Sequence, residues 1–356
     1  MRIITKYLLR KFIRNFVIVL ISLQIFFVGI DFLQNFDEVP NSANLQLLYI
    51  LYNSFFTLTL TLPLSLVFGW IITIVIMVKT NEMVASFSLG VGNRQIFMPV
   101  VNVSIILIVL LIGLQMTPLA YSYEYKEKIL KNTYFTSSKS DIFVKYNDYF
   151  VYFKKLYPLQ KYAEDIHIYK VVDDDIEEGI VAKKAYFQNN RWYVIDAKIT
   201  KKPKVISWNS SKIEIHHEKF LYTLEGFKPK ILDSVYESTS SFSILDAITA
   251  LALLNNQEVN TSKIRASLYY EIVAPLYFVP LIILIFSYTS FNSRFFNIGK
   301  FTSFSIASTL VIWGVFFMLH KFSSGGVLNP EVSILLPIFL WYIITYILIK
   351  KKIGYK

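Results

Sequence analysis

Long apolar segments dominate both ends of the chain, and short polar segments separate them. Six stretches predict membrane-spanning helices: 16–36, 45–78, 96–120, 272–291, 301–319 and 332–349. The second stretch carries no charge and is longer than the ~20 residues that a helix needs to cross a bilayer. An even number of spans predicts that both ends of the chain lie on the same side of the membrane.

The middle of the chain has a different composition and a different period. Residues 121–265 hold 22 of the 36 Lys and Arg residues and 19 of the 25 Asp and Glu residues. Apolar positions alternate with a period of two, and Asn147-Asp148 forms a hairpin signal between two such runs. Further strands are predicted at 162–172, 180–187, 192–200 and 212–224, with turns at 189–190 and 202–204. Evenly spaced strands of this kind predict a β-sandwich or jelly-roll layer.

These patterns predict an α-helical membrane protein with three spans on each side of an inserted all-β domain. The expected division is 1–125 for the first three spans, 126–240 for the jelly-roll-like domain, and 241–356 for the rest. The last part begins with a helix at 243–256 that returns the chain to the membrane.

A short polar segment, 79–94, separates the second span from the third and predicts an amphipathic helix at about 80–91. Thr80 or Asn81 can cap its start, and Glu82 then lies in the first turn, where the helix dipole favours an acid. An apolar stripe follows, and glycines end the helix; the residues concerned are Met83, Val84, Phe87, Val91, Gly90 and Gly92. Such a helix either lies on lipid or docks on another protein.

The charges outside the central block fix the orientation. In a six-span arrangement 13 of the 14 remaining Lys and Arg residues fall on one side, and Lys321 falls on the other. The positive-inside rule therefore predicts cytoplasmic ends, a cytoplasmic helix at 80–91 and a periplasmic β-domain. The net charge of +11 is explained by this distribution, so we expect no nucleic-acid partner.

The residue types exclude several kinds of chemistry. There are no cysteines, the four histidines lack metal-ligand spacing, and no glycine-rich phosphate loop is present. We therefore expect no metal, no cofactor and no catalytic residue. Glu271 favours an ion pair with Arg265 over a substrate or proton role. The polar outer end of the first span, with Asp31, fits either a lipid headgroup contact or a helix emerging into water.

Four stretches, taken with the order of parts, carry a resemblance to a known family. They are Leu62-Pro-Leu-Ser-Leu66, Asn81-Glu-Met-Val-Ala-Ser-Phe-Ser-Leu-Gly90, Val181-Ala-Lys-Lys-Ala-Tyr-Phe187 with Trp192, and Gly326-Val-Leu-Asn-Pro330. In this order the chain resembles the LptF/LptG (YjgP/YjgQ) family, the permease subunits of the lipopolysaccharide exporter in the Gram-negative inner membrane.

The resemblance implies a non-catalytic half of an ATP-binding cassette transporter. An LptF-like and an LptG-like chain would pair on a dimer of the ATPase LptB, and lipopolysaccharide would pass towards LptC and LptA. Glu82 matches the glutamate of the family's coupling helix, with Met83, Val84, Phe87 and Gly90 around it. Lipid would enter between the first span of one permease and the fifth span of the other. The implied gate positions are Phe26, Phe27, Ile30, Gln34, Phe304, Leu310 and Phe317.

One departure concerns the outer end of the first span. LptG-type chains often carry lysines there, whereas this chain has Asp31, Asp37 and Glu38. The choice between the two family members stays open, and the 31–38 stretch favours LptG. A function from another class also fits the predicted topology: a membrane-anchored periplasmic sensor or assembly scaffold. That alternative assigns no function to the predicted cytoplasmic helix at 80–91.

Overall fold

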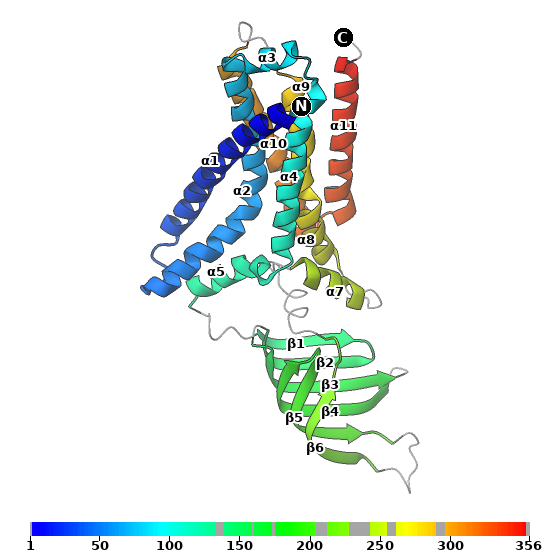
Figure 1. Cartoon of the computed structure of the whole chain (residues 1–356). Helices are drawn as coiled ribbons and strands as arrows, with labels where there is room; N and C mark the ends of the chain where they lie inside the picture. Colours follow the sequence, from blue (N-terminus) through cyan, green and yellow to red (C-terminus); the bar gives the residue numbers. More distant parts are fainter. Residues whose placement is uncertain are drawn as a thin grey trace. The chain divides into compact units, whose positions relative to one another are not determined.

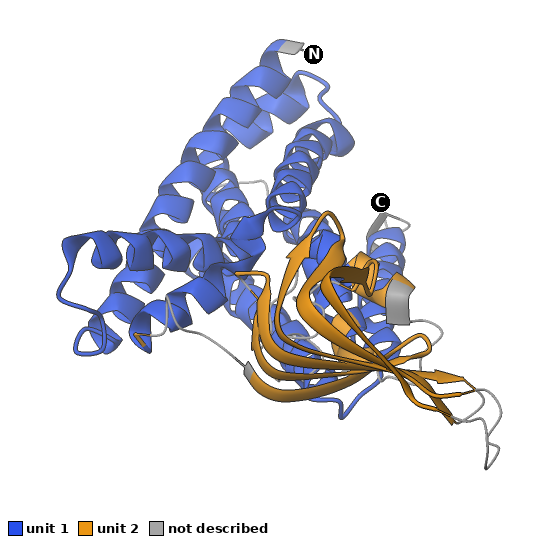
Figure 2. Ribbon diagram, turned by 90° about the horizontal axis from the view of Figure 1, so that it is seen from below, with its two compact units in different colours: residues 1–131, 241–247, 265–356 blue, residues 132–240, 248–264 orange. Residues whose placement is uncertain are grey.

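The computed structural model describes residues 2–132, 139–158, 160–172, 175–203, 212–227, 243–254, 261–289 and 296–353. The chain divides into two compact units, 1–131 with 241–247 and 265–356, and 132–240 with 248–264 (Figure 2). The first unit is helical and is built from both ends of the sequence. The second unit contains the sheet, so the strands are an insertion between two helical halves.

The first half of the helical unit begins with two long helices. The helices in chain order are α1 (Arg2–Gln34), α2 (Ala43–Lys79), α3 (Glu82–Ser88), α4 (Asn93–Gln115), η1 (Pro118–Tyr121) and α5 (Ser122–Leu130) (Figure 1). At 37 residues α2 extends about 55 Å, which exceeds the thickness of a hydrocarbon core. Lipid contains no water that could hydrogen-bond the backbone, so an apolar segment in lipid must pair its own N–H and C=O groups, as a helix does.

The remaining helices follow the sheet in the chain. They are α7 (Ile244–Leu254), α8 (Ser262–Ile272), η2 (Ala274–Tyr277), α9 (Phe278–Ser287), α10 (Ile298–Ser324), η3 (Glu331–Leu335) and α11 (Leu336–Ile353). Most of α7 and the first residues of α8 belong to the second unit, and the others complete the helical unit. The connecting helix predicted at 243–256 is confirmed as α7, within the described residues.

Five helices in the described residues are long and apolar enough to cross a membrane. A sixth span exists if α8 and the Ala274–Ser287 segment count as one, although they meet at an angle of 43°. Of the expected fourth span, 272–291, the described part contains the helical segment 274–287, which is long enough to cross only together with α8, and residues 290–291 lie outside the described residues. Pro275 lies at the break, where its missing N–H interrupts the hydrogen bonding of a continuous helix.

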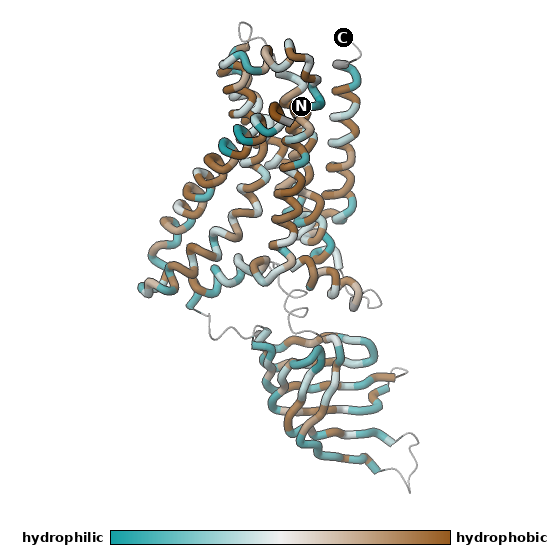
Figure 3. The backbone as a smooth tube through the Cα atoms, in the orientation of Figure 1, coloured by the Kyte–Doolittle hydropathy of each residue, from teal (hydrophilic) through white to brown (hydrophobic). Residues whose placement is uncertain are grey.

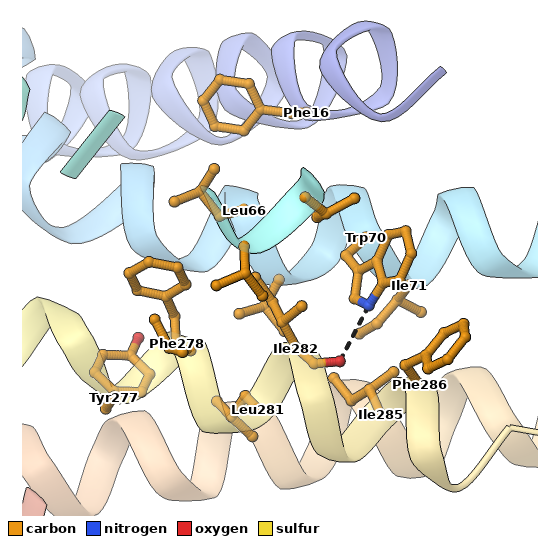
Figure 4. Packing of buried hydrophobic residues seen from close by; sticks show 14 of the residues in the cluster. Phe16, Leu66, Trp70, Ile71, Tyr277, Phe278, Leu281, Ile282, Ile285 and Phe286 are labelled. Carbon is orange, nitrogen blue, oxygen red and sulfur yellow. Dashed lines mark hydrogen bonds between the residues drawn. The ribbon is translucent and has the colours of Figure 1, made fainter. Parts of the chain in front are cut away.

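The core of the helical unit lies around α2 and α9. Trp70 is fully buried, and its Nε1 donates to the carbonyl oxygen of Ile282 at 3.1 Å (Figure 4). Phe12 and Phe286 lie against its ring, with centroids 6.2 and 6.0 Å away. Apolar residues fill all the long helices (Figure 3), but only part of that apolar surface is buried in this core.

The sheet has six antiparallel strands that pair in chain order, β1-β2-β3-β4-β5-β6. They are β1 (Lys139–Tyr146), β2 (Tyr149–Tyr157), β3 (Tyr162–Val172), β4 (Asp175–Gln188), β5 (Arg191–Lys201) and β6 (Glu214–Thr223). The hairpin at Asn147-Asp148 is confirmed by the pairing of Tyr146 with Tyr149. Asn189 and Asn190, both with positive φ, form the two-residue turn between β4 and β5, as predicted.

One face of this sheet is packed. Phe153, Ile166, Ile168 and Trp192 are fully buried, and Trp192 Nε1 donates to the carbonyl oxygen of Phe227 at 2.8 Å. The strands predicted after 162 are confirmed as β3 to β6, with β4 starting earlier than expected. Of the predicted turn at 202–204, residue 204 lies outside the described residues. The described strands make a single sheet, whereas a jelly roll packs two.

Candidate functional site

The helix predicted in the polar segment between spans two and three is α3, seven residues long. Its end follows the prediction: Gly90 has a φ of +76°, and the Val91 N–H donates to the Ser86 carbonyl at 3.1 Å. These features form a Schellman motif, in which glycine is the usual residue at this position because it adopts a positive φ without strain. The start differs. Asn81 is the N-cap residue with a φ of 59° and makes no side-chain capping bond, while Thr80 Oγ1 donates back to Ile76 in α2.

The apolar stripe of α3 is divided between the interior and the surface. Met83 is fully buried in the core of the helical unit, and Phe87 packs against the same core. Val84 is 45% exposed, and Leu89, just beyond the helix, is 76% exposed. Met83 therefore holds α3 to its own chain, and Val84 is the stripe residue presented outward. The sequence interpretation missed Leu89, because it lies outside the helical spacing.

Glu82 pairs with α1. Lys11 Nζ lies 2.5 Å from both carboxylate oxygens of Glu82, and the two side chains are 15% and 26% exposed. Burial raises the pKa of Glu82, but hydrogen bonds from Lys11, Thr80 and Tyr7 outweigh it and lower the pKa below its usual range. Lys11 was missed from sequence because it is 71 positions away. The sequence held one signal: in the predicted six-span arrangement, Glu82 is the one acidic residue on the side predicted to hold 13 basic residues.

Polar side chains line the seam between α1 and α2. Asn15 Nδ2 donates to Thr73 Oγ1 at 2.9 Å, and Gln24 Nε2 donates to Thr61 Oγ1 at 2.7 Å. Near the same seam Gly69 lets the helices approach closely, since a Cβ there would lie 2.8 Å from the Cα of Phe16. Small residues and interhelical hydrogen bonds are the usual means by which helices associate in lipid.

A second ion pair ties the other end of α1. Lys126 Nζ of α5 lies 2.8 Å from Asp31 Oδ1, and the two side chains are 6% and 26% exposed. Tyr49 OH donates to Asp31 Oδ2 at 2.5 Å. The rings of Tyr49, Phe56 and Tyr123 lie within 5.9 Å of the ammonium group. The carboxylate of Asp31 is therefore engaged inside the chain, whereas Asp37 and Glu38 are exposed.

The predicted gate residues lie on two different helices. Phe26, Phe27, Ile30 and Gln34 of α1 and Phe304, Leu310 and Phe317 of α10 are exposed except for Phe317, which is partly buried and stacks on Trp313. In the described part of the chain α1 packs against α2 and α4, and α10 packs against α2 and η3. The gate assignment, which needs a second subunit, stays a prediction.

The expected ion pair between Glu271 and Arg265 is wrong. Arg265 pairs instead with Glu331, whose Oε1 also lies 3.4 Å from the Tyr269 hydroxyl. Glu271 accepts a hydrogen bond from Ser267 Oγ at 3.4 Å, one helical turn away. The described residues contain no group of three or more His, Cys, Asp or Glu side chains that could hold a metal ion.

Comparison with known proteins identifies the family. A family model described as the lipopolysaccharide export system permease LptF/LptG matches residues 6–351. A search of curated proteins finds no match. The matched region contains α3, both halves of the helical unit and the whole sheet. The chain therefore belongs to the LptF/LptG family of lipopolysaccharide export permeases.

Proposed function

We propose that this chain is one of two permease subunits of an ATP-binding cassette transporter. It extracts lipopolysaccharide from the inner membrane and passes it to a periplasmic bridge of LptC-like and LptA-like proteins. The observation that carries this proposal is the family match over residues 6–351, which leaves no described element outside it except the first residues of α1 and the last of α11. In this role the chain hydrolyses no ATP itself.

The proposed topology has six spans, with α8 and the Ala274–Ser287 segment crossing as one bent span. Both ends of the chain are cytoplasmic, and the sheet, as part of a jelly-roll-like domain near 126–240, is periplasmic. Within the helical unit, the start of α1, the end of α11 and α3 share one end (Figure 1), which supports this orientation. Arg10 near the start of α1, Lys79 at the end of α2 just before α3, and Lys350 near the end of α11 are basic residues of this end.

In the proposed mechanism α3 is the coupling helix on an LptB-like ATPase dimer. The exposed apolar side chains Val84 and Leu89 fit a hydrophobic groove on that partner, and Met83 anchors the helix to its own core. ATP binding closes the ATPase dimer and carries α3 with it. Its motion then rearranges the first, second and fifth spans and drives the lipid outward.

The proposed gate lies between α1 of one permease and the fifth span of its paralogous partner. The exposed faces of α1 and α10 support this arrangement, since neither is covered by another described helix of the chain. The acidic 31–38 stretch favours the LptG-like member of the pair.

Purification of tagged chain from membranes tests the proposal. An ATPase subunit and a paralogous permease co-purify with the wild-type chain, and Val84→Asp, which places a charge on the outward face of α3, loses the ATPase. Ile106→Asn, an exposed site on α4, is the control that keeps it. Consistent absence of an ATPase from wild-type preparations contradicts the proposal and favours the sensor or scaffold function.

Side-specific labelling tests the topology. The chain has no native cysteine, so single cysteines at Ser86 in α3 and Asn189 in the β4–β5 turn report without background. Cysteine 86 reacts only from the cytoplasm and cysteine 189 only from the periplasm. Labelling of both from one side contradicts the six-span arrangement.

A further inference from the structure

We propose that the ion pair of Lys11 with Glu82 is the joint through which the coupling helix moves the first span. This inference rests on the proposed function, because it assigns the step between ATPase closure and gate movement. Lys11 and Glu82 act in it as positioning residues: they contact neither ATP nor lipid, and they fix α1 to α3.

Lys11 and Glu82 are in direct contact. The ammonium group of Lys11 lies 2.5 Å from each carboxylate oxygen, and both side chains are partly buried. A charge-assisted contact of this kind is shorter and stronger than a hydrogen bond between neutral groups. The ring of Tyr7, with its centroid 4.7 Å from the ammonium group, closes the pair on the side of α1.

Buried neighbours hold the backbone on both sides of the ion pair. On α1, Leu8 and Phe12 lie one helical turn apart, on either side of Lys11 in the sequence, and both are fully buried in the helical core. On α3, Met83 follows Glu82 and is fully buried in that same core. A displacement of α3 therefore reaches α1 through the ion pair and its packed neighbours, rather than through a flexible loop.

Most of the apolar surface of α1 is not packed within the chain, since only 6% of the residues in its most apolar stretch are buried. The helix is held along its seam with α2 and at its outer end by the ion pair of Asp31 with Lys126. A push at Lys11 therefore acts on a helix that is fixed on one side and uncovered on the other. The ion pair lies at the inner end of this helix, on the same helix as Phe26, Phe27 and Ile30 of the proposed gate. A movement at Lys11 is transmitted along a continuous helix to those residues.

The charge pattern on this side favours a dedicated partner for Glu82. It is the one acid among 13 Lys and Arg residues predicted on the cytoplasmic side, and its carboxylate is bound by Lys11. If the carboxylate served only to contact a basic group of the ATPase, Lys11 would be dispensable. The joint instead requires opposite charges at 11 and 82, in either order.

A charge-reversal experiment in the reconstituted complex tests this. The readouts are the amount of ATPase retained and the lipopolysaccharide released per ATP hydrolysed. Lys11→Gln and Glu82→Gln each retain the ATPase but lower the release per ATP by at least about fivefold, the lower end of typical coupling between sites. The double variant Lys11→Glu with Glu82→Lys restores most of the lipopolysaccharide release per ATP. The matched control, Arg10→Glu with Glu82→Lys, has the same net charge but does not restore the release, because Arg10 is exposed on another face of α1.

Two results overturn the joint while leaving the proposed function intact: wild-type release per ATP in Lys11→Gln, or no gain from the reversed pair over Glu82→Lys alone. Lys11→Arg keeps the charge and retains most of the release, which separates pairing from a requirement for lysine. A wild-type complex without any ATPase overturns the proposed function itself, and the joint with it.

Discussion

Two neighbouring helices, α1 and α2, are both strongly apolar but have opposite positions in the molecule. In the most apolar stretch of α2, 78% of the residues are buried within the chain, whereas in α1 the share is 6%. The two helices pack along one seam with polar hydrogen bonds and a close approach at Gly69. Beyond that seam α2 is surrounded by α4, α9 and α10, while most of α1 faces outward.

The difference shows that hydropathy predicts which helices enter the membrane but not which of them are buried within the protein. Lipid is as apolar as a protein core, so burying an apolar side chain between helices gains little from solvent exclusion. Packing and polar contacts decide instead. α2 carries Trp70, Gly69 and a series of buried threonines, including Thr57, Thr61 and Thr73, whereas the outer face of α1 carries Ile and Phe suited to lipid or a partner.

The largest effect is expected in the core around α2. Trp70→Ala removes a fully buried ring and its hydrogen bond to Ile282, so it lowers the free energy of unfolding by about 3–5 kcal/mol. Ile25→Ala on the exposed face of α1 changes it by less than about 0.5 kcal/mol. Thermal unfolding of the purified complex measures both. Equal losses would contradict the contrast between the helices.

The outer ion pair is expected to rank next. Asp31→Asn leaves Lys126 buried without its counter-charge, at a cost of about 3 kcal/mol, the lower end for a buried pair, because Asp31 is 26% exposed. Adding Lys126→Met to Asp31→Asn recovers part of the loss. Thermal unfolding of the two single variants and the double variant gives the coupling. Additive losses would show that the pair does not hold α1 to α5.

Gly69 tests the seam itself. Gly69→Ala places a Cβ 2.8 Å from the Cα of Phe16, so α1 must move away, at a cost of about 1–3 kcal/mol. Gly113→Ala in α4 meets nothing within 4 Å and is neutral or slightly stabilising, because alanine favours the helix. Unfolding midpoints of the two variants compare the sites. A neutral Gly69→Ala would mean that α1 does not depend on this approach.

Acid should loosen α3 from α1. The pKa of Glu82 is lowered in the folded chain, so its stabilisation is complete above its ordinary pKa of 4.5 and disappears as the pH falls through the folded value. We expect a loss of about 1.5 kcal/mol, the lower end for a hydrogen bond to a charged group. Faster backbone hydrogen exchange of residues 82–91 in the complex would report this loss of stability. Glu82→Gln should show no such pH dependence, and an identical profile would rule out the pair as its cause.

The sequence predicted what depends on local pattern. The strands follow from period-two alternation, the β4–β5 turn from Asn189-Asn190, and the end of α3 from Gly90, whose positive φ suits glycine. Long apolar runs predicted the five long apolar helices of the described residues. The break at Pro275 was missed because the apolar pattern runs through it without interruption.

Contacts between distant residues could not be predicted in the same way. Lys11 meets Glu82 across 71 positions and Lys126 meets Asp31 across 95, and no periodicity links such positions. The error at Glu271 has the same origin: Arg265 is near in sequence, but its partner Glu331 is 66 positions away. The apolar stripe of α3 was predicted, yet sequence alone did not separate the inward Met83 from the outward Val84.

The central claim is that the uncovered face of α1 is a gate closed by the partner's fifth span. A reversible disulfide tests it most directly, with a cysteine at Phe27 and one on the facing span of the partner in reconstituted vesicles. We predict that the pair cross-links, that release of lipopolysaccharide stops, and that a reducing agent restores it, while a cysteine at Ile106 on the exposed face of α4 forms no such link. Full release with the cross-link in place, or preferential cross-linking from Ile106, would contradict the account.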